Sequence, residues 1–389
     1  MIARAASETL MRLARGFPIL AITGPRQSGK TTLAKAAFAG KPYLSLEDPD
    51  LRDLAETDPR GLLSRFPEGA ILDEVQRAPN LFSYLQTQVD EKLRPGSFVL
   101  TGSQQFGLLS GITQTLAGRV GLVQLLPFSM GELREAGRLP GDLDEFLLRG
   151  SYPPLYDRDL APADWHGNYI STYVERDVRQ LIALRDLSAF QRFIRLCAAR
   201  VGQLLNLSSL AADCGVSHNT ASAWLSVLEA SYIVFLLRPH FSNFSKRLVK
   251  APKLYFCDTG LAGWLLGIRE PAQMAFHALR GSLFENLVVT DFLKARLNQG
   301  VPPDLHFWRD SRGLEVDLVV EKDGGIQPIE VKSGRTIAPD FFDSLGRWNA
   351  LAGRTGGASW LVYGGESALR HGGVEVVPWK GLPELEGRL

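Results

Sequence analysis

The sequence contains little cysteine and almost no net charge. Among its 389 residues only three are cysteines, Cys197, Cys214 and Cys257, and their spacing matches no zinc or thiol–disulfide motif. A small and odd number of cysteines is typical of a protein from a reducing compartment. The formal net charge of +1 excludes binding to nucleic acid through the overall field of the molecule. Any surface for nucleic acid must therefore be a local patch.

Long hydrophobic runs are also missing. The longest one that we find covers Tyr232–Leu237, far short of the roughly 20 residues of a membrane-spanning helix. The first fifteen residues mix Arg4, Glu8 and Arg12 with apolar positions and lack the apolar centre of a secretory signal. We therefore expect a soluble, cytoplasmic protein without a membrane partner. A chain of 389 residues that is 45% hydrophobic and 22% charged predicts two or three globular domains.

The most distinctive motif is a glycine-rich loop between an apolar run, Phe17–Thr23, and a segment with helical spacing, Thr31–Phe38. This is the strand–loop–helix context of a P-loop, in which backbone N–H groups and a helix N-terminus bind a polyphosphate. Lys30 is expected to reach the β- and γ-phosphates, and Thr31 to bind Mg²⁺. The cofactors predicted are ATP and Mg²⁺, with GTP as an open alternative to ATP because the residues that contact the base are not identifiable. The residues expected to bind the nucleotide are Gly24, Pro25, Arg26, Gln27, Ser28, Gly29, Lys30, Thr31 and Thr32.

Two later apolar segments end in polar residues that suit nucleotide hydrolysis. The first leads to Asp73, a candidate Mg²⁺ ligand, and to Glu74, a candidate for polarising the attacking water. The second ends in Ser103 and Gln104, candidates for sensing the γ-phosphate. Strands that end in functional groups at one edge predict a parallel, doubly wound α/β sheet. Without the P-loop, the acidic pair would be interpreted as a solvated loop.

The P-loop, the Asp-Glu pair and the polar end of the third strand together resemble the AAA+ ATPase group. Arg119, which follows Gly118, resembles an arginine found after this strand in a bacterial and archaeal branch of that group. The resemblance implies that an arginine from a neighbouring subunit stabilises the phosphate charge. It therefore implies a homo-oligomer, with a hexameric ring as a frequent form in the group. Arg119 is the first candidate and Arg176 the second, and either could equally be a structural salt-bridge partner.

The middle of the sequence predicts helices and a DNA-binding module. Pro127–Pro162 is rich in glycine and proline and is expected to be a connector, and a helical region follows over 165–203. Leu207–Leu225 resembles a helix-turn-helix in which Gly215 permits the turn and Ser217 caps the second helix.

Polar residues of the second helix are expected to face a DNA groove, namely His218, Asn219 and Thr220. A strand pair, Tyr232–Pro239 and Lys253–Asp258, encloses a basic stretch with Lys246, Arg247 and Lys250, and Lys253 directly after it. Together these segments resemble a winged helix that binds DNA. The alternative is a module that serves packing or oligomerisation only.

The last third of the sequence predicts a helix over Gly281–Ala295, with an apolar stripe that leaves out Glu285 and Asn286. Three strands follow, at His306–Arg309, Glu315–Val320 and Ile329–Lys332. Residues two apart in a strand share a face, so Glu315 lies with Asp317 and Glu330 with Lys332. If the last two strands are neighbours, Asp317, Glu330 and Lys332 converge.

Such a convergence suits metal-assisted hydrolysis of phosphodiesters, with Mg²⁺ on the carboxylates and a lysine orienting or activating water. The pattern resembles the PD-(D/E)XK nuclease-like fold, although Glu-Val stands before Asp317 where a proline is common. The resemblance implies Glu285, Asp317 and Glu330 as metal ligands and Lys332 as a catalytic residue. The alternatives are a charge pair on a solvated strand and a nuclease fold that has lost cleavage.

The predicted domains are an ATPase core over 1–160, a helical and winged-helix region over 161–270, and a nuclease-like domain over 271–389. This order resembles prokaryotic AAA+ ATPases with a C-terminal nuclease-like domain. We expect an ATP-hydrolysing protein that acts on double-stranded or branched DNA. The alternative is a regulatory ATPase whose C-terminal domain binds a partner and does not cleave DNA.

Overall fold

The computed structural model describes residues 1–91, 94–103, 112, 115–174, 186–240, 249–322, 325–353 and 358–389. The chain forms two compact units, each described here by itself. The N-terminal unit comprises Met1–Phe128 with two short later segments, Ala230–Tyr232 and Arg296–Pro302. The C-terminal unit comprises Ser129–Glu229, Ile233–Ala295 and Pro303–Leu389.

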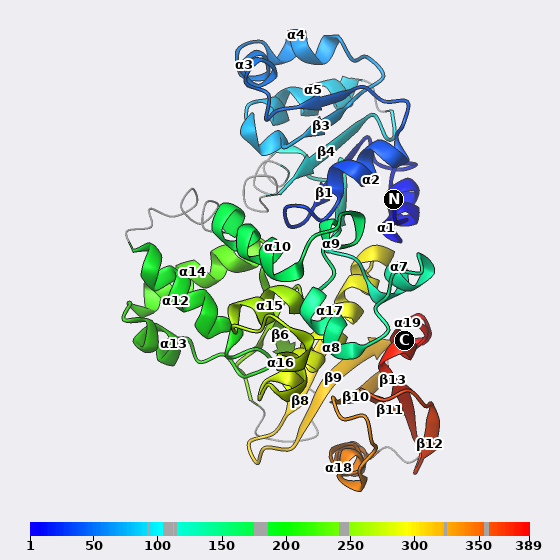
Figure 1. Ribbon diagram of the computed structural model, residues 1–389. Helices are drawn as coiled ribbons and strands as arrows, with labels where there is room; N and C mark the ends of the chain where they lie inside the picture. Colours follow the sequence, from blue (N-terminus) through cyan, green and yellow to red (C-terminus); the bar gives the residue numbers. More distant parts are fainter. Residues whose placement is uncertain are drawn as a thin grey trace. The chain divides into compact units, whose positions relative to one another are not determined.

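The described part of the N-terminal unit contains a five-stranded parallel sheet in the order β2-β3-β4-β1-β5 (Figure 1). Its strands are β1 (Ile19–Thr23), β2 (Tyr43–Ser45), β3 (Ile71–Asp73), β4 (Phe98–Gly102) and β5 (Val120–Gln124). Its helices are α1 (Ala6–Leu13), α2 (Lys30–Ala37), α3 (Pro49–Thr57), α4 (Pro59–Ser64), the 3₁₀ turn η1 (Val75–Arg77) and α5 (Leu81–Glu91). The prediction of a parallel α/β sheet is confirmed.

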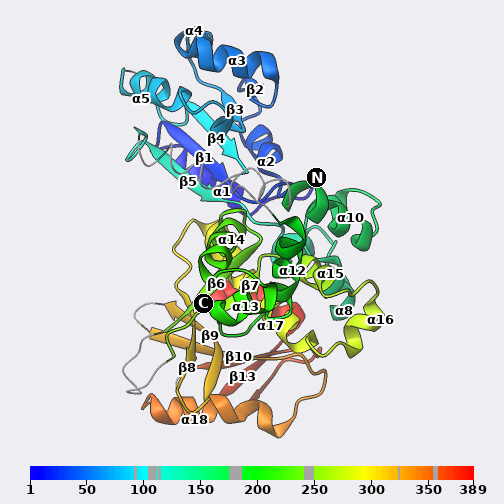
Figure 2. The same cartoon turned by 90° about the vertical axis from the view of Figure 1, so that its left-hand side faces the viewer.

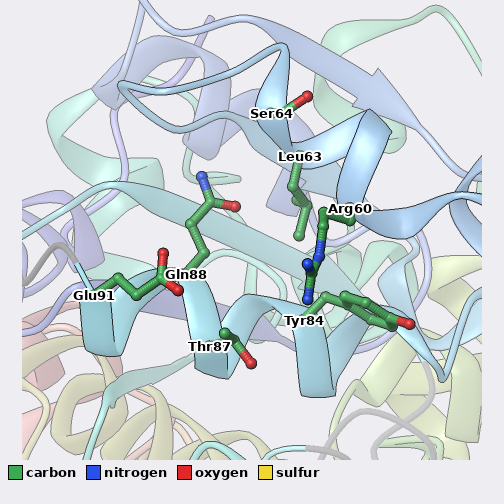
Figure 3. A pocket seen from close by; sticks show the side chains of 7 residues that line it. All are labelled: Arg60, Leu63, Ser64, Tyr84, Thr87, Gln88 and Glu91. Atoms are coloured by element: carbon green, nitrogen blue, oxygen red, sulfur yellow. The ribbon is translucent and has the colours of Figure 1, made fainter.

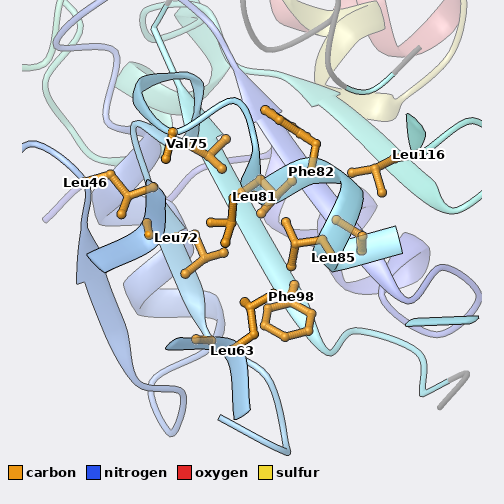
Figure 4. Close-up of a cluster of buried hydrophobic side chains, with 14 of the residues drawn as sticks. Leu46, Leu63, Leu72, Val75, Leu81, Phe82, Leu85, Phe98 and Leu116 are labelled. Atoms are coloured by element: carbon orange, nitrogen blue, oxygen red, sulfur yellow. The ribbon is translucent and has the colours of Figure 1, made fainter. Parts of the chain in front are cut away.

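Alternate residues of the central strand β1 enter two different cores. Ile19 and Ala21 pack with residues of α3, α4 and α5, whereas Leu20 and Ile22 pack with α1 and α2. Figure 4 shows the first of these cores, where Phe98 lies among leucines. This period of two places helices on both faces of the sheet, so both faces are covered and the strands are apolar throughout.

The two later segments complete the N-terminal unit. The hydroxyl of Tyr232 donates a hydrogen bond to Thr23 Oγ1 over 2.8 Å, at the end of β1. Tyr232 adopts a positive φ of 56°, which is uncommon for a residue with a side chain. The guanidinium of Arg12 donates to the carbonyl oxygen of Gln299 over 2.9 Å.

The C-terminal unit contains many short helices before its last sheet strands. Its helices are α7 (Met130–Glu135), α8 (Leu143–Arg149), α9 (Pro154–Asp157), α10 (Pro162–Tyr169), the π-helical turn η2 (Ile170–Val174), α12 (Leu187–Ala198), α13 (Leu207–Cys214), α14 (His218–Ala230), α15 (Thr259–Leu265), α16 (Pro271–Phe276), α17 (Arg280–Gln299), the 3₁₀ turn η3 (Pro339–Phe342), α18 (Asp343–Leu351), the 3₁₀ turn η4 (Trp379–Gly381) and α19 (Leu382–Arg388). The last residues of α14 and α17 are counted with the N-terminal unit.

Strands of the C-terminal unit form one mixed sheet in the order β12-β13-β11-β10-β9-β8-β6-β7 among the described residues. They are β6 (Val234–Pro239), β7 (Lys253–Phe256), β8 (Leu305–Arg309), β9 (Glu315–Lys322), β10 (Gly325–Lys332), β11 (Ser359–Tyr363), β12 (Leu369–His371) and β13 (Val374–Pro378). The central strand β10 runs antiparallel to β9 and parallel to β11. Helix α18 lies beside this sheet (Figure 2). Its Leu345 and Trp348 pack with Trp308 and Val316 of the sheet.

The boundaries of these units differ from the predicted domains. The segment 127–162, expected to be a loop-rich connector, forms α7, α8 and α9. Buried contacts hold it in the C-terminal unit, since Met130 N donates to Asp291 Oδ1 over 2.9 Å and Arg280 pairs with Asp144. The first boundary therefore falls after Phe128 instead of near 160. The C-terminal unit runs across residue 270, because β6 pairs with β8 and joins segments on either side into one sheet.

The region 165–203, expected to be helical, contains α10, η2 and α12 among its described residues, and 175–185 lies outside them, Arg176 included. Helix α17 has no solvated polar side over its middle, because Asn286 and Asp291 are fully buried along with its apolar residues. Asn286 pairs with the backbone of Phe256, which satisfies its amide. Within the described ranges, no helix has both the length and the apolar character needed to cross a bilayer.

Candidate functional site

The predicted P-loop lies between β1 and α2 in the N-terminal unit. Gly24 has a φ of 147°, and a Cβ there would lie 2.1 Å from the carbonyl oxygen of Leu125, so only glycine fits. Lys30 opens α2, and its ammonium donates to the carbonyl oxygens of Gly24 and Pro25 over 3.0 and 2.7 Å. The hydroxyl of Ser28 is buried and has no hydrogen-bond partner among the described residues. A tight glycine-lined loop with an ammonium and an unsatisfied hydroxyl fits a polyphosphate.

Asp73 at the end of β3 is held by hydroxyl groups from three neighbouring elements. Thr31 of α2 donates to its two carboxylate oxygens over 3.0 and 3.1 Å, and Tyr43 of β2 donates over 2.7 Å. Thr101 of β4 also bonds to it. The structure thus brings Thr31 and Asp73 together, as the sequence predicted. A hydroxyl and a carboxylate at this spacing are the oxygen ligands that Mg²⁺ prefers.

Tyr43 and Thr101 are residues of this site that sequence reasoning missed. Burial, and then the hydrogen bond to Asp73, raise the pKa of Tyr43 to about 12, so its hydroxyl stays a donor. Thr101 interrupts the apolar run of β4, whereas Tyr43 is the first residue of β2 and no such pattern marks it. That interruption was the available signal for Thr101.

Glu74 directly follows β3 and has a left-handed backbone with a φ of 55°. Ser103, which follows β4, donates to Glu74 Oε2 over 3.1 Å, and Gln76 bonds to the same oxygen. The structure therefore joins the two residues predicted for water activation and phosphate sensing. Gln104 lies outside the described residues.

Arg119 lies at the opposite end of the sheet from the P-loop of its own chain. Its carbonyl oxygen accepts from Ile19 N over 3.2 Å, at the start of β1, whereas the P-loop follows the end of that strand. Its guanidinium makes two hydrogen bonds to Asp90 of α5, over 2.6 and 2.8 Å. The hydrogen bond from Arg119 lowers the pKa of Asp90. Arg119 therefore cannot contact a nucleotide bound in its own chain in this conformation.

A separate hollow of about 240 Å³ lies between α4 and α5 (Figure 3). Figure 3 shows Arg60 beside the ring of Tyr84, with Gln88 and Glu91 farther along α5. None of the residues predicted to bind nucleotide lines it. It is therefore distinct from the P-loop site.

The predicted helix-turn-helix is confirmed in its local geometry. Gly215 ends α13 with a φ of 72°, and Ser217 Oγ accepts from Thr220 N over 3.1 Å at the start of α14. His218 and Asn219 are exposed there. The following strands β6 and β7 pair in antiparallel fashion, as expected.

The basic stretch differs from its prediction at one end. Lys250 is exposed, and Lys246 and Arg247 lie outside the described residues. Lys253, expected to end this patch, is only 2% exposed and belongs to another site.

That site, called the carboxylate site, consists of Glu285 on α17, Glu315 and Asp317 on β9, and Glu330 on β10. Oxygen atoms of Glu285, Glu315 and Asp317 lie within 4.8 Å of one another. Asp317 Oδ2 accepts from Val331 N over 2.8 Å, so this side chain bonds to the backbone of the neighbouring strand. The predicted convergence of Asp317 and Glu330 is therefore present.

Glu330 and Glu285 are carboxyl groups in a strongly perturbed environment. Burial, and then the charge of Asp317, raise the pKa of Glu330 to about 8 and that of Glu285 to about 7. Lys332 lies 2.5 Å from Glu330 Oε1. Glu330 is 3% exposed, and its other oxygen, Oε2, has no hydrogen-bond partner among the described residues. A buried carboxylate oxygen without a donor fits a metal cation.

Lys253 on β7 is the main residue of this site that sequence reasoning missed. Its ammonium lies 2.8 Å from Glu285 Oε1 and also pairs with Glu315. Tyr255, two residues later and on the same face, donates to Glu285 as well. Although burial opposes the charge, Glu285, Asp317 and Glu315 hold the pKa of Lys253 above its ordinary value. The alternation of Lys253 and Tyr255 in a strand was the signal in the sequence.

The carboxylate site opens into a pocket of about 770 Å³ in the C-terminal unit. Asp317, Glu330 and Lys332 line it, together with Arg312 and Arg347. Both arginines are exposed. The pocket thus combines carboxylates at its floor with cations that suit phosphate groups.

Comparisons with known proteins divide the chain in three. Residues 16–134 match an AAA domain, and residues 140–272 and 280–382 match two domains of unknown function, DUF8612 and DUF4143. Among solved structures, the Walker-type ATPase paby2304 of Pyrococcus abyssi is 16% identical, with a TM-score of 0.46 over 68% of this chain and 96% of its own.

Two curated relatives cover most of the chain. They are the uncharacterized proteins Rv2008c of Mycobacterium tuberculosis and Mb2031c of Mycobacterium bovis. Each is 32% identical over 345 residues, which are 88% of this chain and 76% of the relative. The chain therefore belongs to the same family as these two mycobacterial proteins, and it carries an AAA-type P-loop ATPase domain over residues 16–134.

Proposed function

We propose that this ATPase acts on DNA and that its carboxylate site hydrolyses phosphodiester bonds with the help of Mg²⁺. The observation that carries the proposal is the convergence of Asp317, Glu330 and Lys332 in one pocket, with a buried Glu330 oxygen that has no donor among the described residues. Such an oxygen is costly to bury in the charged form without a cation.

Five of the residues that line the pocket have a role in this proposal. Asp317 and Glu330 would hold a divalent cation, which would supply Lewis-acid activation of the phosphate and of the attacking water. Lys332 orients the attacking water and stabilises the charge that develops on the phosphate. Arg312 and Arg347 bind flanking phosphates of the strand, since both guanidiniums line the same pocket.

In this proposal, the N-terminal unit hydrolyses ATP. Residues 24–32 wrap the phosphates of ATP, Thr31 and Asp73 hold Mg²⁺, and Glu74 polarises the water. Because Arg119 lies at the far end of its own sheet, its position favours a role in the site of a neighbouring subunit. We therefore propose a homo-oligomer, with a hexameric ring as the form to test first.

DNA contact is proposed for the helix-turn-helix. His218 and Asn219 are exposed at the start of α14, where a helix N-terminus can also approach a phosphate. Thr220 and Lys250 complete the described part of this surface, and Lys246 and Arg247 are expected to extend it. Binding through such a patch should weaken as salt is raised.

The test measures phosphate release and DNA integrity in the same tubes, with linear, forked and junction DNA. We expect Mg²⁺-dependent cleavage that Asp317→Asn abolishes while ATP hydrolysis is retained. The matched control is Asp340→Asn, an exposed aspartate of the same unit outside the site. If the wild-type protein neither binds nor cleaves any of these substrates, the proposal is wrong.

A second candidate function is a regulatory ATPase whose carboxylate site binds a partner without cleavage. The observation that favours it is Lys253, which already compensates part of the negative charge. This candidate is favoured if the DNA stays intact and Asp317→Asn changes only the assembly of the protein with a partner.

A further inference from the structure

Lys253 places a positive charge inside the carboxylate site without a bound metal. Its side chain is 2% exposed, so the ammonium does not exchange with solvent cations at the surface. It lies 2.8 Å from Glu285 Oε1 and pairs with Glu315 as well. This ammonium occupies the space between two carboxylates that a metal ion could otherwise bridge.

The carboxylate site therefore has two unlike halves. In the first half, Glu285 pairs with Lys253 and accepts a hydrogen bond from Tyr255. Glu315 pairs with Lys253 and also with Arg309, whose Nη1 lies 2.8 Å from Glu315 Oε2. In the second half, one oxygen of Asp317 accepts from Val331 N, and Glu330 pairs with Lys332 through one oxygen only.

The remaining oxygen of Glu330 is buried and has no donor among the described residues. Asp317 lines the same pocket as Glu330, so both carboxylates are open to an ion that enters from it. The first half is thus satisfied by protein cations, and the second half is not.

A divalent cation in the first half would have to displace Lys253. An ammonium that leaves one buried position needs another partner, and breaking a buried pair costs several kcal/mol. A cation in the second half meets Lys332, which pairs with Glu330 and also interacts with Asp317. The Lys332 side chain is 32% exposed and can turn into the pocket, whereas that of Lys253 is 2% exposed and has no such way out. The second half is therefore the less costly place for an ion.

Resting on the metal-dependent function proposed above, we infer that Lys253 takes the place of a second divalent cation, so that the carboxylate site binds a single ion between Asp317 and Glu330. Lys253 is then a positioning residue, which keeps Glu285 and Glu315 in place as an ion would. Hydrolysis at this site proceeds with one divalent ion and a fixed ammonium, in contrast to sites where two ions lie roughly 4 Å apart.

The test is a titration with Mn²⁺ in the absence of nucleotide, followed by electron paramagnetic resonance. The number of Mn²⁺ ions bound by the Asp317→Asn variant gives the ions bound elsewhere on the protein. The number bound by the wild type minus this number gives the ions bound in the carboxylate site. We expect a difference of one ion with the spectrum of an isolated Mn²⁺. Two ions with an exchange-coupled spectrum in the wild type would overturn the inference, although the proposed metal site would stand.

Three variants test the role of Lys253 itself. Lys253→Met should admit one more Mn²⁺ and produce the coupled spectrum, whereas Lys253→Arg keeps the charge and should keep a single ion. Adding Glu315→Gln to Lys253→Met should return the count to one. An unchanged count in a folded Lys253→Met protein would overturn the inference.

Two outcomes separate the failures. If Asp317→Asn and the wild type bind equal amounts of Mn²⁺, the proposed metal site is wrong, and the inference falls with it. If Lys253→Met does not fold, as judged by circular dichroism, the line shape of the wild-type protein alone decides between one ion and a coupled pair.

Discussion

The two sites for phosphate chemistry balance their negative charge in different ways. Asp73 of the P-loop site is held by hydroxyls of Thr31, Tyr43 and Thr101, which donate hydrogen bonds and carry no charge. The carboxylate site instead gathers four acidic groups around three cations of the protein. These groups are Glu285, Glu315, Asp317 and Glu330, with Lys253, Arg309 and Lys332.

The two arrangements place different demands on the charge of the ligand that binds. Hydroxyl groups orient a carboxylate and leave its charge for a magnesium ion that arrives with the nucleotide. The lysine ammonium groups of the carboxylate site hold the carboxylates in place before any ligand binds. They therefore reduce the number of divalent cations that the site can bind. Substitutions at either site separate these two arrangements.

Lys30→Ala should abolish ATP hydrolysis, because the ammonium that closes the P-loop is also the group expected to reach the phosphates. A malachite-green assay of released phosphate should fall below detection. Arg15→Ala is the control, since Arg15 is an exposed cation of the same unit and precedes β1, at the end of that strand away from the P-loop. Hydrolysis at the wild-type rate in Lys30→Ala would contradict the assignment of the site.

Arg119→Ala should slow turnover by roughly 1000-fold while nucleotide binding is retained, as expected for an arginine that acts from a neighbouring subunit. The measurements are steady-state phosphate release and the Kd of a fluorescent ATP analogue. Mixing Arg119→Ala with a Lys30→Ala protein should restore part of the activity if sites form between subunits. An unchanged rate would leave Arg119 as the partner of Asp90 only.

Glu330→Gln should make the protein more stable at high pH. Because the pKa of Glu330 is raised from 4.5 to about 8, the folded state retains a proton that the unfolded state releases between these values. Wild-type stability therefore loses this contribution as pH rises through that window, and the variant does not. We expect equal stability at low pH and a gain of at least ~1.4 kcal/mol near pH 9, the equivalent of one pKa unit.

Urea unfolding in the presence of a chelator measures this effect. Glu366→Gln, which changes an exposed carboxylate of the same unit, is the control and should show no such gain. If the Glu330→Gln protein instead loses stability relative to the wild type as pH rises, the neighbouring carboxylates do not raise the pKa of Glu330.

Tyr232→Phe should have the smallest effect. The change removes the hydroxyl that donates to Thr23 and leaves a buried threonine oxygen with one partner fewer. The expected loss is about 1 kcal/mol in the free energy of unfolding. Chemical denaturation followed by tryptophan fluorescence gives the value, and Thr23→Val in a double-mutant cycle shows whether the pair accounts for it.

Features that are local in the sequence could be predicted well. The P-loop, the Asp73-Glu74 pair and the cap of α14 by Ser217 depend on residues a few positions apart. The convergence of Asp317, Glu330 and Lys332 followed from strand alternation once two strands were taken as neighbours.

Features that depend on long-range pairing could not be predicted. Lys253 was expected to belong to an exposed basic patch, because its neighbours in the sequence are basic and its partners Glu285 and Glu315 are distant. Helix α17 shows the same limit, since its polar residues find buried partners on β7 and α7. The pairing of β6 with β8 is of the same kind, because it joins segments on either side of residue 270 into one sheet.

The N-terminal unit is not a continuous stretch of the gene product. Residues 230–232 and 296–302 belong to it, and they supply the hydrogen bond from Tyr232 to Thr23 and the carbonyl that accepts from Arg12. A fragment that ends at Phe128 would therefore lack part of its own folded surface. Recombination that exchanged the AAA segment alone between relatives would separate these partners, so such an exchange has to carry matching residues from all three stretches.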